Sequence, residues 1–324
     1  MSLPAWSVHE RVHHRARPTS HATTLTAVLR AAPRRLFGVY VDPWHLREWR
    51  ARVGARPSMV AKFEAFSRRR TADRFLRQVE RDNVAWAMVS WEPWKPVPAR
   101  LGWRRQARSQ PGYTNREIAA GIQDAYISRF ARSLARFHGI VYLRYAHEMN
   151  GFWYPWSADQ RAYVRAWRHI VRVVRNAGAR NVRFVWSVNP SLYESRKTWL
   201  RKLRRYWPGA AYVDVVGSTM INFGGVKNYT VARFEPVLLR LRRVFRKPVY
   251  LTETNTGWVG RVRWLRDLRR MVGRHPWVRA IVWSQLPSRG QAQQRRSVGD
   301  LNWNVTGDPA AATVLRGVAR DGAR

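Results

Sequence analysis

The chain has 324 residues, 45% of them hydrophobic, which is enough to bury one large core, and it carries a formal net charge of +40. The absence of cysteine excludes disulfides, thiolate metal sites and a cysteine nucleophile. No apolar run approaches the roughly 18 residues that a membrane-spanning helix needs, so the sequence predicts no membrane span.

The positive charge is almost entirely arginine. Lysine occurs only at positions 62, 95, 197, 202, 227 and 247. The arginines are spread over every expected helix, whereas nucleic-acid binders usually concentrate their charge on one face or tail. Two interpretations stay open: solvated helix faces, or a functional attraction to an acidic polymer.

Residues 1–33 are basic, and their one apolar run, Leu25 to Leu29, is short and ends at Arg30. We expect a basic, disordered leader with no clear signal peptide. His13 and His14 could bind a metal by chance, but no second cluster with ligand spacing accompanies them. We therefore expect no metal site.

From Leu36 onward, short apolar runs alternate with longer segments of helical periodicity, which is typical of repeated βα units and a parallel sheet. The expected strands are Leu36 to Val41, Ser58 to Phe63, Val84 to Val89, Ile140 to Arg144, Val182 to Trp186, Val213 to Gly217, Val249 to Thr252 and Ala280 to Trp283. Eight strands predict a single-domain (β/α)8 TIM barrel of the α/β class. We place it at residues 34–308, followed by a C-terminal tail at 309–324.

The expected helices lie between these strands and end near Gly, Asn, Pro or a basic residue. They include Glu117 to Phe137, Ala158 to Asn176, Lys197 to Tyr206, Val231 to Phe245 and Val262 to Val272. No phosphate-binding loop or G-x-G-x-x-G motif is present, so we expect no cofactor.

The stretch from Trp91 to Asn115 is rich in Pro, Gly, Trp and Arg and shows no periodicity. We expect a long loop at the barrel mouth, where such loops build binding sites. Its Trp94, Trp103 and Tyr113 either line a polysaccharide groove or pack among themselves.

The most informative segment follows the fourth expected strand and reads LRYAHEMNGFWYPW. Its carboxylate, Glu148, lies at the strand end where barrel enzymes place catalytic groups. Apolar surroundings favour the protonated form that a general acid needs, and Trp153, Tyr154 and Trp156 can form flat walls for sugar rings. The alternatives are core packing for the aromatic residues and an ion pair with an arginine such as Arg144 for the carboxylate.

A second carboxylate, Glu253, ends the seventh expected strand in the segment PVYLTETNTGW. Two carboxylates at the ends of barrel strands are the groups that cleave a glycosidic bond. In the retaining version they lie about 5 to 5.5 Å apart, one as nucleophile and the other as acid/base.

The chain resembles glycoside hydrolase family 26, which contains β-mannanases and some β-1,3-xylanases and β-glucanases, over about Leu36 to Val305. The most specific match is HEMNG at positions 147–151, followed by Trp153 and by Pro155-Trp156. The resemblance implies that Glu148 is the acid/base and Glu253 the nucleophile. It also implies that His147 helps to bind the sugar at the cleavage point and that Trp153 stacks nearby.

Looser matches stand at the ends of other strands. They are Ser90-Trp91-Glu92-Pro93, Trp186-Ser187-Val188-Asn189-Pro190, Asn222 and Trp283. We expect Trp91, Glu92, Asn189, Asn222, Trp283 and Trp156 to contribute to substrate binding.

One departure concerns the sixth strand, where relatives carry Gly-x-Asp-x-Tyr-Asn with a tyrosine that hydrogen-bonds the nucleophile. Here Ile221 takes the place of that tyrosine and cannot form the bond. The change indicates a different sugar in the cleavage subsite, a substitute partner such as Asn222 or Tyr250, or a weakened enzyme. Glu92 is a third carboxylate at the mouth, for which an ion pair with an arginine of residues 100–108 competes with a substrate contact.

The sequence thus predicts a cofactor-free, monomeric, retaining endo-glycosidase acting on β-mannan or a related β-glycan. A secreted or cell-surface location suits that substrate class. The alternatives are a hydrolase or binder of an acidic exopolysaccharide, a non-catalytic carbohydrate-binding barrel, and a general polyanion binder.

Overall fold

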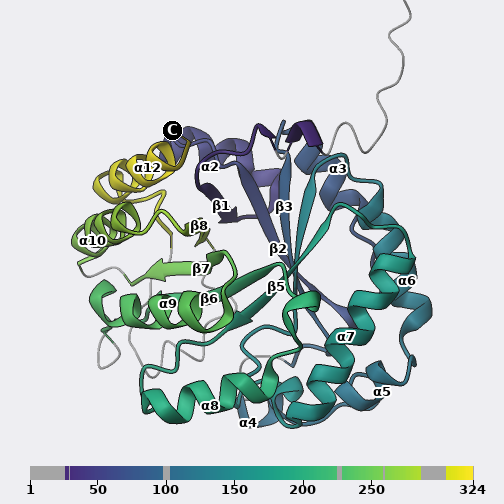
Figure 1. Cartoon of the computed structure of the whole chain (residues 1–324). Coiled ribbons are helices and arrows are strands. Elements are labelled where there is room, and N and C mark those ends of the chain that lie inside the picture. Colours follow the sequence, from purple (N-terminus) through teal and green to yellow (C-terminus); the bar gives the residue numbers. More distant parts are fainter. Residues whose placement is uncertain are drawn as a thin grey trace, which may run out of the picture.

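The fold is a closed barrel of eight parallel strands in sequential order, which confirms the (β/α)8 barrel expected from the sequence (Figure 1). The computed structural model describes residues 26–28, 30–97, 103–224, 228–257, 260–285 and 304–323. The strands are β1 (Leu36–Tyr40), β2 (Met59–Ala65), β3 (Trp86–Glu92), β4 (Ile140–Tyr145), β5 (Val182–Val188), β6 (Val215–Asn222), β7 (Val249–Thr256) and β8 (Val278–Ser284). Pairing of β1 with β8 closes the barrel.

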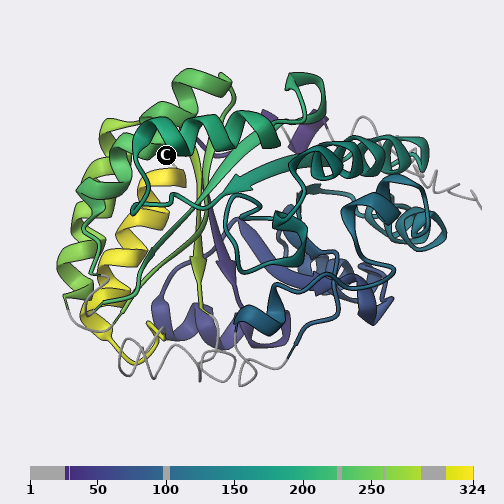
Figure 2. The ribbon, with the colours of Figure 1, turned by 90° about the horizontal axis from the view of Figure 1, so that it is seen from below.

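Helices surround the strands on all sides (Figures 1 and 2). They are α2 (Leu46–Val53), α3 (Asp73–Arg81), α4 (Trp103–Gln106), α5 (Asn115–Ala119), α6 (Asp124–Ala135), α7 (Gln160–Asn176), α8 (Arg196–Tyr206), α9 (Val231–Phe245), α10 (Arg261–Arg274) and α12 (Pro309–Ala323). None of the helices in the described ranges is long and apolar enough to cross a membrane.

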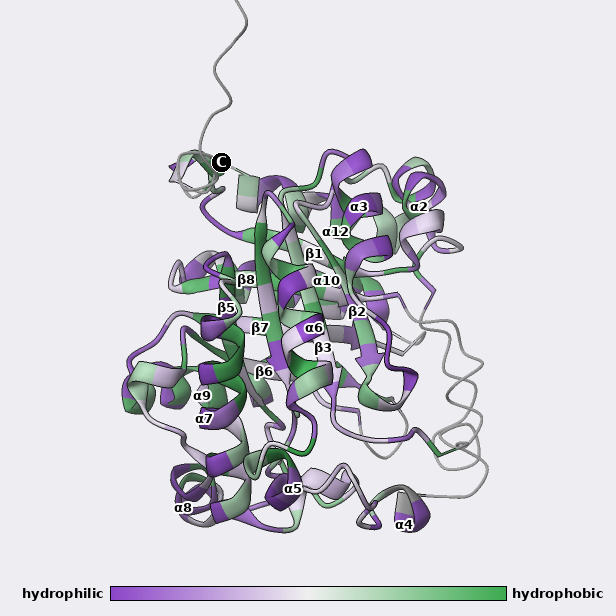
Figure 3. Cartoon of the chain, turned by 90° about the vertical axis from the view of Figure 1, so that its right-hand side faces the viewer, coloured by the Kyte–Doolittle hydropathy of each residue, from purple (hydrophilic) through white to green (hydrophobic). Residues whose placement is uncertain are grey.

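The core has two layers because strand side chains alternate between the barrel interior and the helices. The interior holds residues such as Tyr40, Met59 and Met88, whereas the outer layer joins the strands to the helices. Figure 3 shows the hydrophobic colour concentrated on the strands and the hydrophilic colour on the outward sides of the helices.

One expected helix is two helices in the structure. The segment predicted as Glu117 to Phe137 is divided into α5 and α6, because Gly121 has a φ of +88° and its N–H bonds the carbonyl of Ile118. A left-handed residue ends a helix, and glycine adopts it without a Cβ penalty. The break is not evident from the sequence because the apolar periodicity continues across it.

The C-terminal residues form part of the helical ring. Helix α12 packs against α10, α2 and β1 (Figure 1), and Arg35 N–H bonds the carbonyl of Gly322 at 2.9 Å. The domain limits expected at residues 33 and 308 stay predictions. Most of the expected leader, including His13 and His14, lies outside the described residues.

Candidate active site

The inward side chains at the carboxyl ends of the strands are polar and charged. Ser90 and Glu92 come from β3, Arg144 from β4 and Glu253 from β7, and all four are buried or nearly so. Burying charged groups is costly unless they are paired. Such a concentration of charge at the mouth of a barrel therefore indicates a site for chemistry.

Glu148 follows β4 in a strained backbone conformation. Its φ is +52°, in the left-handed region that residues with a side chain rarely adopt. The backbone N–H of Glu148 donates to the carbonyl of Ser187 at 2.8 Å, which ties this turn to β5. The strain is held in place by surrounding contacts, as is common at functional sites.

The Glu148 carboxylate accepts hydrogen bonds from two neutral donors. The indole N–H of Trp153 lies 3.1 Å from Oε2, and the side-chain amide of Asn189 lies 3.2 Å from Oε1. The carboxylate is 8% exposed. Two neutral donors therefore hold the carboxylate in one orientation.

Asn150, which is not among the binding residues expected from the sequence, positions Asn189. Its side chain donates to the carbonyl of Asn189 and accepts from the N–H of Asn189, both at 2.8 Å. These paired bonds join the loops after β4 and β5. The signal was present, because Asn150 lies within the HEMNG segment.

A β-bulge directs Glu253 into the barrel. Ser218 on β6 pairs with Leu251 on β7, but the next residue, Thr219, pairs with Glu253, so Thr252 is an extra residue in β7. A bulge of this kind changes the direction of the side chains that follow it. Strict alternation from Leu251 would have left Glu253 on the outward side.

Gly217 makes room for the bulge. A Cβ at this position would lie 2.5 Å from Cγ2 of Thr252 and 3.0 Å from Cβ of Ser187. The hydroxyls of Ser187 and Thr252 are 2.7 Å apart. The small residue therefore permits the contact that holds the extra residue inside the barrel.

Arg144 is the partner of Glu253. Its Nη1 lies 3.2 Å from Glu253 Oε2, 3.1 Å from Ser90 Oγ and 3.3 Å from Tyr40 Oη, and its Nη2 lies 3.3 Å from Thr219 Oγ1. Arg144 is fully buried. The sequence offers Arg144 as a partner of Glu148, whereas the structure pairs it with Glu253.

The buried carboxylates bind protons more tightly than exposed ones. Burial raises the pKa of Glu253 to about 6; Arg144 opposes this effect and the negative charge of Glu148 adds to it. Burial also raises the pKa of Glu92 to about 7, opposed by the hydrogen bond from the Trp94 indole at 3.2 Å. Residues 100–102, part of the stretch expected to supply an arginine for Glu92, lie outside the described residues.

The aromatic residues after Glu148 form a packed cluster. Trp156 is 1% exposed, stacks on Tyr154 with ring centroids 4.3 Å apart, and donates its indole N–H to the carbonyl of His147 at 2.8 Å. Trp94 packs against the same rings. Trp156 is thus buried among its neighbours, and its expected contribution to substrate binding stays a prediction.

His147 packs against the rings of Tyr154 and Trp156. Its Nε2 is 3.1 Å from the Tyr154 hydroxyl, and the side chain is 1% exposed. Burial and the nearby Arg144 charge hold the pKa of His147 well below its ordinary value. A neutral histidine in this position orients Tyr154, and its expected contact with the sugar stays a prediction.

Two other expected binding residues point away from the mouth. Trp91 is fully buried against the helices, where its ring stacks on Phe130 at 4.4 Å and its indole donates to Tyr126 at 3.2 Å. Trp283 is also fully buried, in the layer between strands and helices. Strand alternation is the reason, because Trp91 stands between the inward residues Ser90 and Glu92.

Asn222 holds the loop after β6 instead of contacting Glu253. Its amide donates to Asn228 at 3.0 Å and to Thr256 at 3.1 Å, and it is 3% exposed. Tyr250 donates to Tyr142 at 2.8 Å within the barrel. Neither residue takes the place of the missing tyrosine beside Glu253, where the structure places Arg144 instead.

Exposed aromatic side chains lie on the loops that follow the strands. Trp44 follows β1, Phe152 follows β4 and Tyr193 follows β5, and their exposed fractions are 45%, 55% and 59%. Of the expected loop residues, Tyr113 is partly buried against the core, and the side chain of Trp103 lies outside the described residues.

No group of His, Asp and Glu in the described ranges is arranged to hold a metal ion. The chemistry that the described residues offer is that of carboxylates: two acids at the ends of β4 and β7, one among neutral donors and one beside a buried arginine.

Known proteins resemble this chain in sequence. The sequence model "Glycosyl hydrolase family 26" matches residues 114–234, which include Glu148. Endoglucanase H of Acetivibrio thermocellus is 28% identical over 200 residues, covering 57% of this chain and 20% of that protein. Beta-1,3-xylanase TXYA of a Vibrio species is 33% identical over 105 residues, covering 31% of this chain and 21% of that protein. The chain thus spans about a fifth of the length of these curated relatives.

Solved structures share the fold. A GH26 β-mannanase from Bacteroides ovatus has a TM-score of 0.59 at 18% identity, covering 93% of this chain and 92% of its own. An endo-β-1,4-mannanase from Cellulomonas fimi has a TM-score of 0.63 at 16% identity, covering 94% and 75%. At such identities the likeness shows the barrel and no more.

Proposed function

Because the chain belongs to glycosyl hydrolase family 26, we propose that it hydrolyses a β-linked polysaccharide internally and with retention of configuration. Glu148 acts as acid/base and Glu253 as nucleophile. The observation that carries the proposal is the contrast between two carboxylates of one mouth: Glu148 is held by neutral donors, and Glu253 is paired with the buried Arg144.

That contrast suits double displacement. The positive charge of Arg144 favours ionised Glu253, which attacks the anomeric carbon while Glu148 gives its proton to the departing oxygen. In the second step Glu148 removes a proton from water, and that water releases the sugar from Glu253. The negative charge of Glu148 contributes to the raised pKa of Glu253, as two carboxylates of one mouth would.

The first experiment measures reducing-end release from β-mannan, β-1,4-glucan, mixed-linkage glucan and β-1,3-xylan. Glu148→Ala and Glu253→Ala are each expected to lower the rate by several orders of magnitude. Glu48→Ala on α2 is the matched control, since its carboxylate is exposed and pairs only with Arg52 four residues away among the described contacts. Binding to a polymer without release by the parent chain would support a carbohydrate-binding barrel instead.

The two roles can be distinguished by rescue with azide. In Glu253→Ala, azide attacks the anomeric carbon directly and yields a glycosyl azide of inverted configuration. In Glu148→Ala with a dinitrophenyl glycoside, whose leaving group needs no acid, azide attacks the glycosyl-enzyme and yields the retained product. The opposite pattern would reverse the assignment of the two residues.

A further inference from the structure

An unbroken row of arginines runs along the outer face of α7. The row consists of Arg161, Arg165, Arg168, Arg172 and Arg175, separated by steps of four, three, four and three residues, and all five are exposed. Such spacing keeps side chains on one face of a helix. The row spans fourteen residue steps, or about 21 Å of helix axis.

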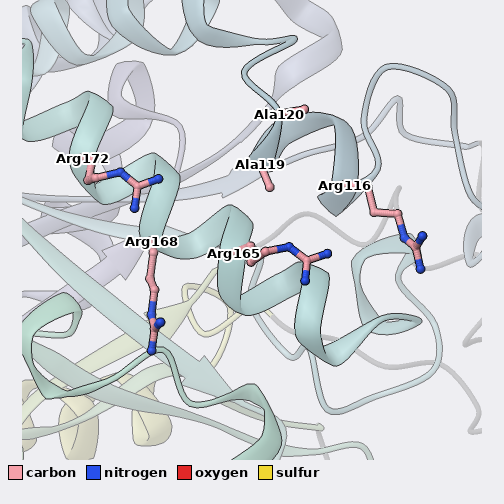
Figure 4. A pocket seen from close by; sticks show the side chains of 6 residues that line it. All are labelled: Arg116, Ala119, Ala120, Arg165, Arg168 and Arg172. Carbon is pink, nitrogen blue, oxygen red and sulfur yellow. The ribbon is translucent and has the colours of Figure 1, made fainter.

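The middle of the row borders a hollow between α7 and α5 (Figure 4). The hollow has a volume of about 430 Å³ and is lined by Arg116, Ala119, Ala120, Arg165, Arg168 and Arg172. This volume lies in the range of small-ligand sites, about 300 to 1,000 Å³. The small side chains of the two alanines leave the hollow open. The other four lining residues are arginines, whose guanidinium groups can donate hydrogen bonds to a ligand.

Two arginines of the row are held in place by the protein. Arg168 donates from Nε to the carbonyl of Pro208 at 2.7 Å and lies over the Tyr212 ring at 5.3 Å. Arg175 donates to the carbonyl of Ala211 at 3.1 Å. Neutral carbonyls fix these side chains without cancelling their charge, so less conformational entropy is lost when an anion binds.

The row has no acidic partner in the described part of the chain. None of its five guanidinium groups has a described carboxylate oxygen within 4 Å, and the ion pair beside the row joins Arg116 of α5 to Asp159, the N-cap of α7, at 2.9 Å. On α10, by contrast, Arg269 pairs with Asp321 and Arg270 with Asp267. Arginines without an ion pair among the described residues also stand on α8 and α9, for example Arg201 and Arg242. What distinguishes the α7 row is the hollow that its middle borders.

The position of the row relates it to the candidate active site. Asp159 caps α7 by accepting from the N–H of Ala162 at 2.9 Å, and it ends the loop that begins with Glu148. Arg161 therefore lies at the mouth end of the helix, and the row leads from the mouth along the outer wall. A polymer that leaves the mouth on this side meets the arginines in succession.

The residues that line the hollow include no aromatic ring. Proteins that bind single-stranded nucleic acids combine basic grooves with aromatic side chains on which bases stack. A polysaccharide that bears carboxylates needs only charge-assisted hydrogen bonds, which guanidinium groups supply in pairs.

We propose that the α7 row and its hollow bind an acidic polysaccharide, a chain of uronate residues, and hold it beside the active site. This proposal deepens the proposed function, on which it rests for the reaction, by naming the substrate class that the outer surface recognises.

The test measures binding of the full chain to polymannuronate and β-1,4-glucuronan, two β-linked uronate polymers, by titration calorimetry at low and moderate salt. The Glu148→Gln background prevents turnover, so the binding result does not depend on whether hydrolysis occurs. One variant carries Arg165→Gln, Arg168→Gln and Arg172→Gln. The control carries Arg263→Gln, Arg266→Gln and Arg270→Gln, which remove the same charge at the same spacing from the exposed face of α10.

We expect the α7 variant to bind the uronate polymers at least about tenfold more weakly and with a smaller dependence on salt, whereas the α10 variant changes affinity less than about twofold. When the same three α7 substitutions are made in the chain that keeps Glu148, the rate of reducing-end release from a neutral β-glycan should stay unchanged. Equal weakening in both variants would show that binding follows net charge alone and overturn the proposal. Tighter binding of a DNA oligonucleotide than of either uronate polymer, lost in the α7 variant, would also overturn it and assign the row to nucleic acid.

Discussion

Replacing Arg144 with methionine tests how the barrel sets the ionisation of Glu253. Methionine fills much of the same volume but removes the guanidinium that lies 3.2 Å from the Glu253 carboxylate and also contacts Ser90, Tyr40 and Thr219. At an effective dielectric constant of about 20, two unit charges at this distance attract each other by about 5 kcal/mol. An adjacent arginine lowers the pKa of a carboxyl group by about 1 to 3 units.

The direction of the effect follows from the role proposed for Glu253. A nucleophile must be ionised, so the acidic limb of kcat/KM against pH reports the pKa of Glu253, about 6 in the parent chain. Without Arg144 that limb should move upward by about 1 to 3 pH units. For a rise of about 2 units, the ionised fraction at pH 7 falls roughly tenfold.

The unfolding free energy of the Arg144→Met chain should also depend on pH. Removing one partner of a buried ion pair costs about 3 to 5 kcal/mol, and this cost applies while Glu253 is charged. Because the variant raises the pKa of folded Glu253 further above its unfolded value, stability is retained at low pH and lost as pH rises through the folded value. The loss in unfolding free energy should therefore be larger at pH 8 than at pH 5.

The assay is a pH–rate profile on the preferred polymer, with urea unfolding at both pH values. Arg144→Lys is the control, since it keeps the charge but loses the planar fork, and its acidic limb should move less. A folded Arg144→Met chain whose acidic limb stays within about 0.3 pH units of the parent would refute the reasoning.

Three further predictions concern other groups. Glu92→Gln should raise the unfolding free energy at pH 8 by about 3 kcal/mol, because burial raises the pKa of Glu92 from 4.5 to about 7. In urea unfolding at pH 4, where Glu92 is protonated, the substitution should change the unfolding free energy little. An equal increase at both pH values would contradict burial of the charge as the cause. Gly217→Ala should destabilise the chain by about 1 to 3 kcal/mol, and it should lower kcat because the added Cβ displaces Thr252 and the bulge that directs Glu253. The control is Gly273→Ala in α10, where nothing lies within 4 Å of an added Cβ. Thermal unfolding should show this control to be neutral or stabilising. Trp153→Phe removes the indole donor to Glu148 and should lower kcat on polymers more than on a dinitrophenyl glycoside; an equal loss on both would place its effect outside the acid step.

The broad fold could be predicted because it depends on local patterns. Apolar runs and helical periodicity identified all eight strands and a helix such as Val231–Phe245 at its observed limits. The division at Gly121 was missed because one left-handed residue does not interrupt the apolar periodicity. Helix α12 was expected only as a tail, and its packing on β1 depends on residues almost 300 positions away in the sequence.

The sequence by itself determined which carboxylates lie at the mouth, since Glu148 follows the fourth strand and Glu253 stands in the carboxyl half of the seventh, at the same end of a parallel barrel. Only the tertiary structure decided which side chains face each other there. The bulge at Thr252 directs Glu253 toward Arg144, and strand alternation turns Trp91 toward the helices. Neither could be inferred from spacing, because a shift of one residue in register reverses the direction of every side chain that follows it.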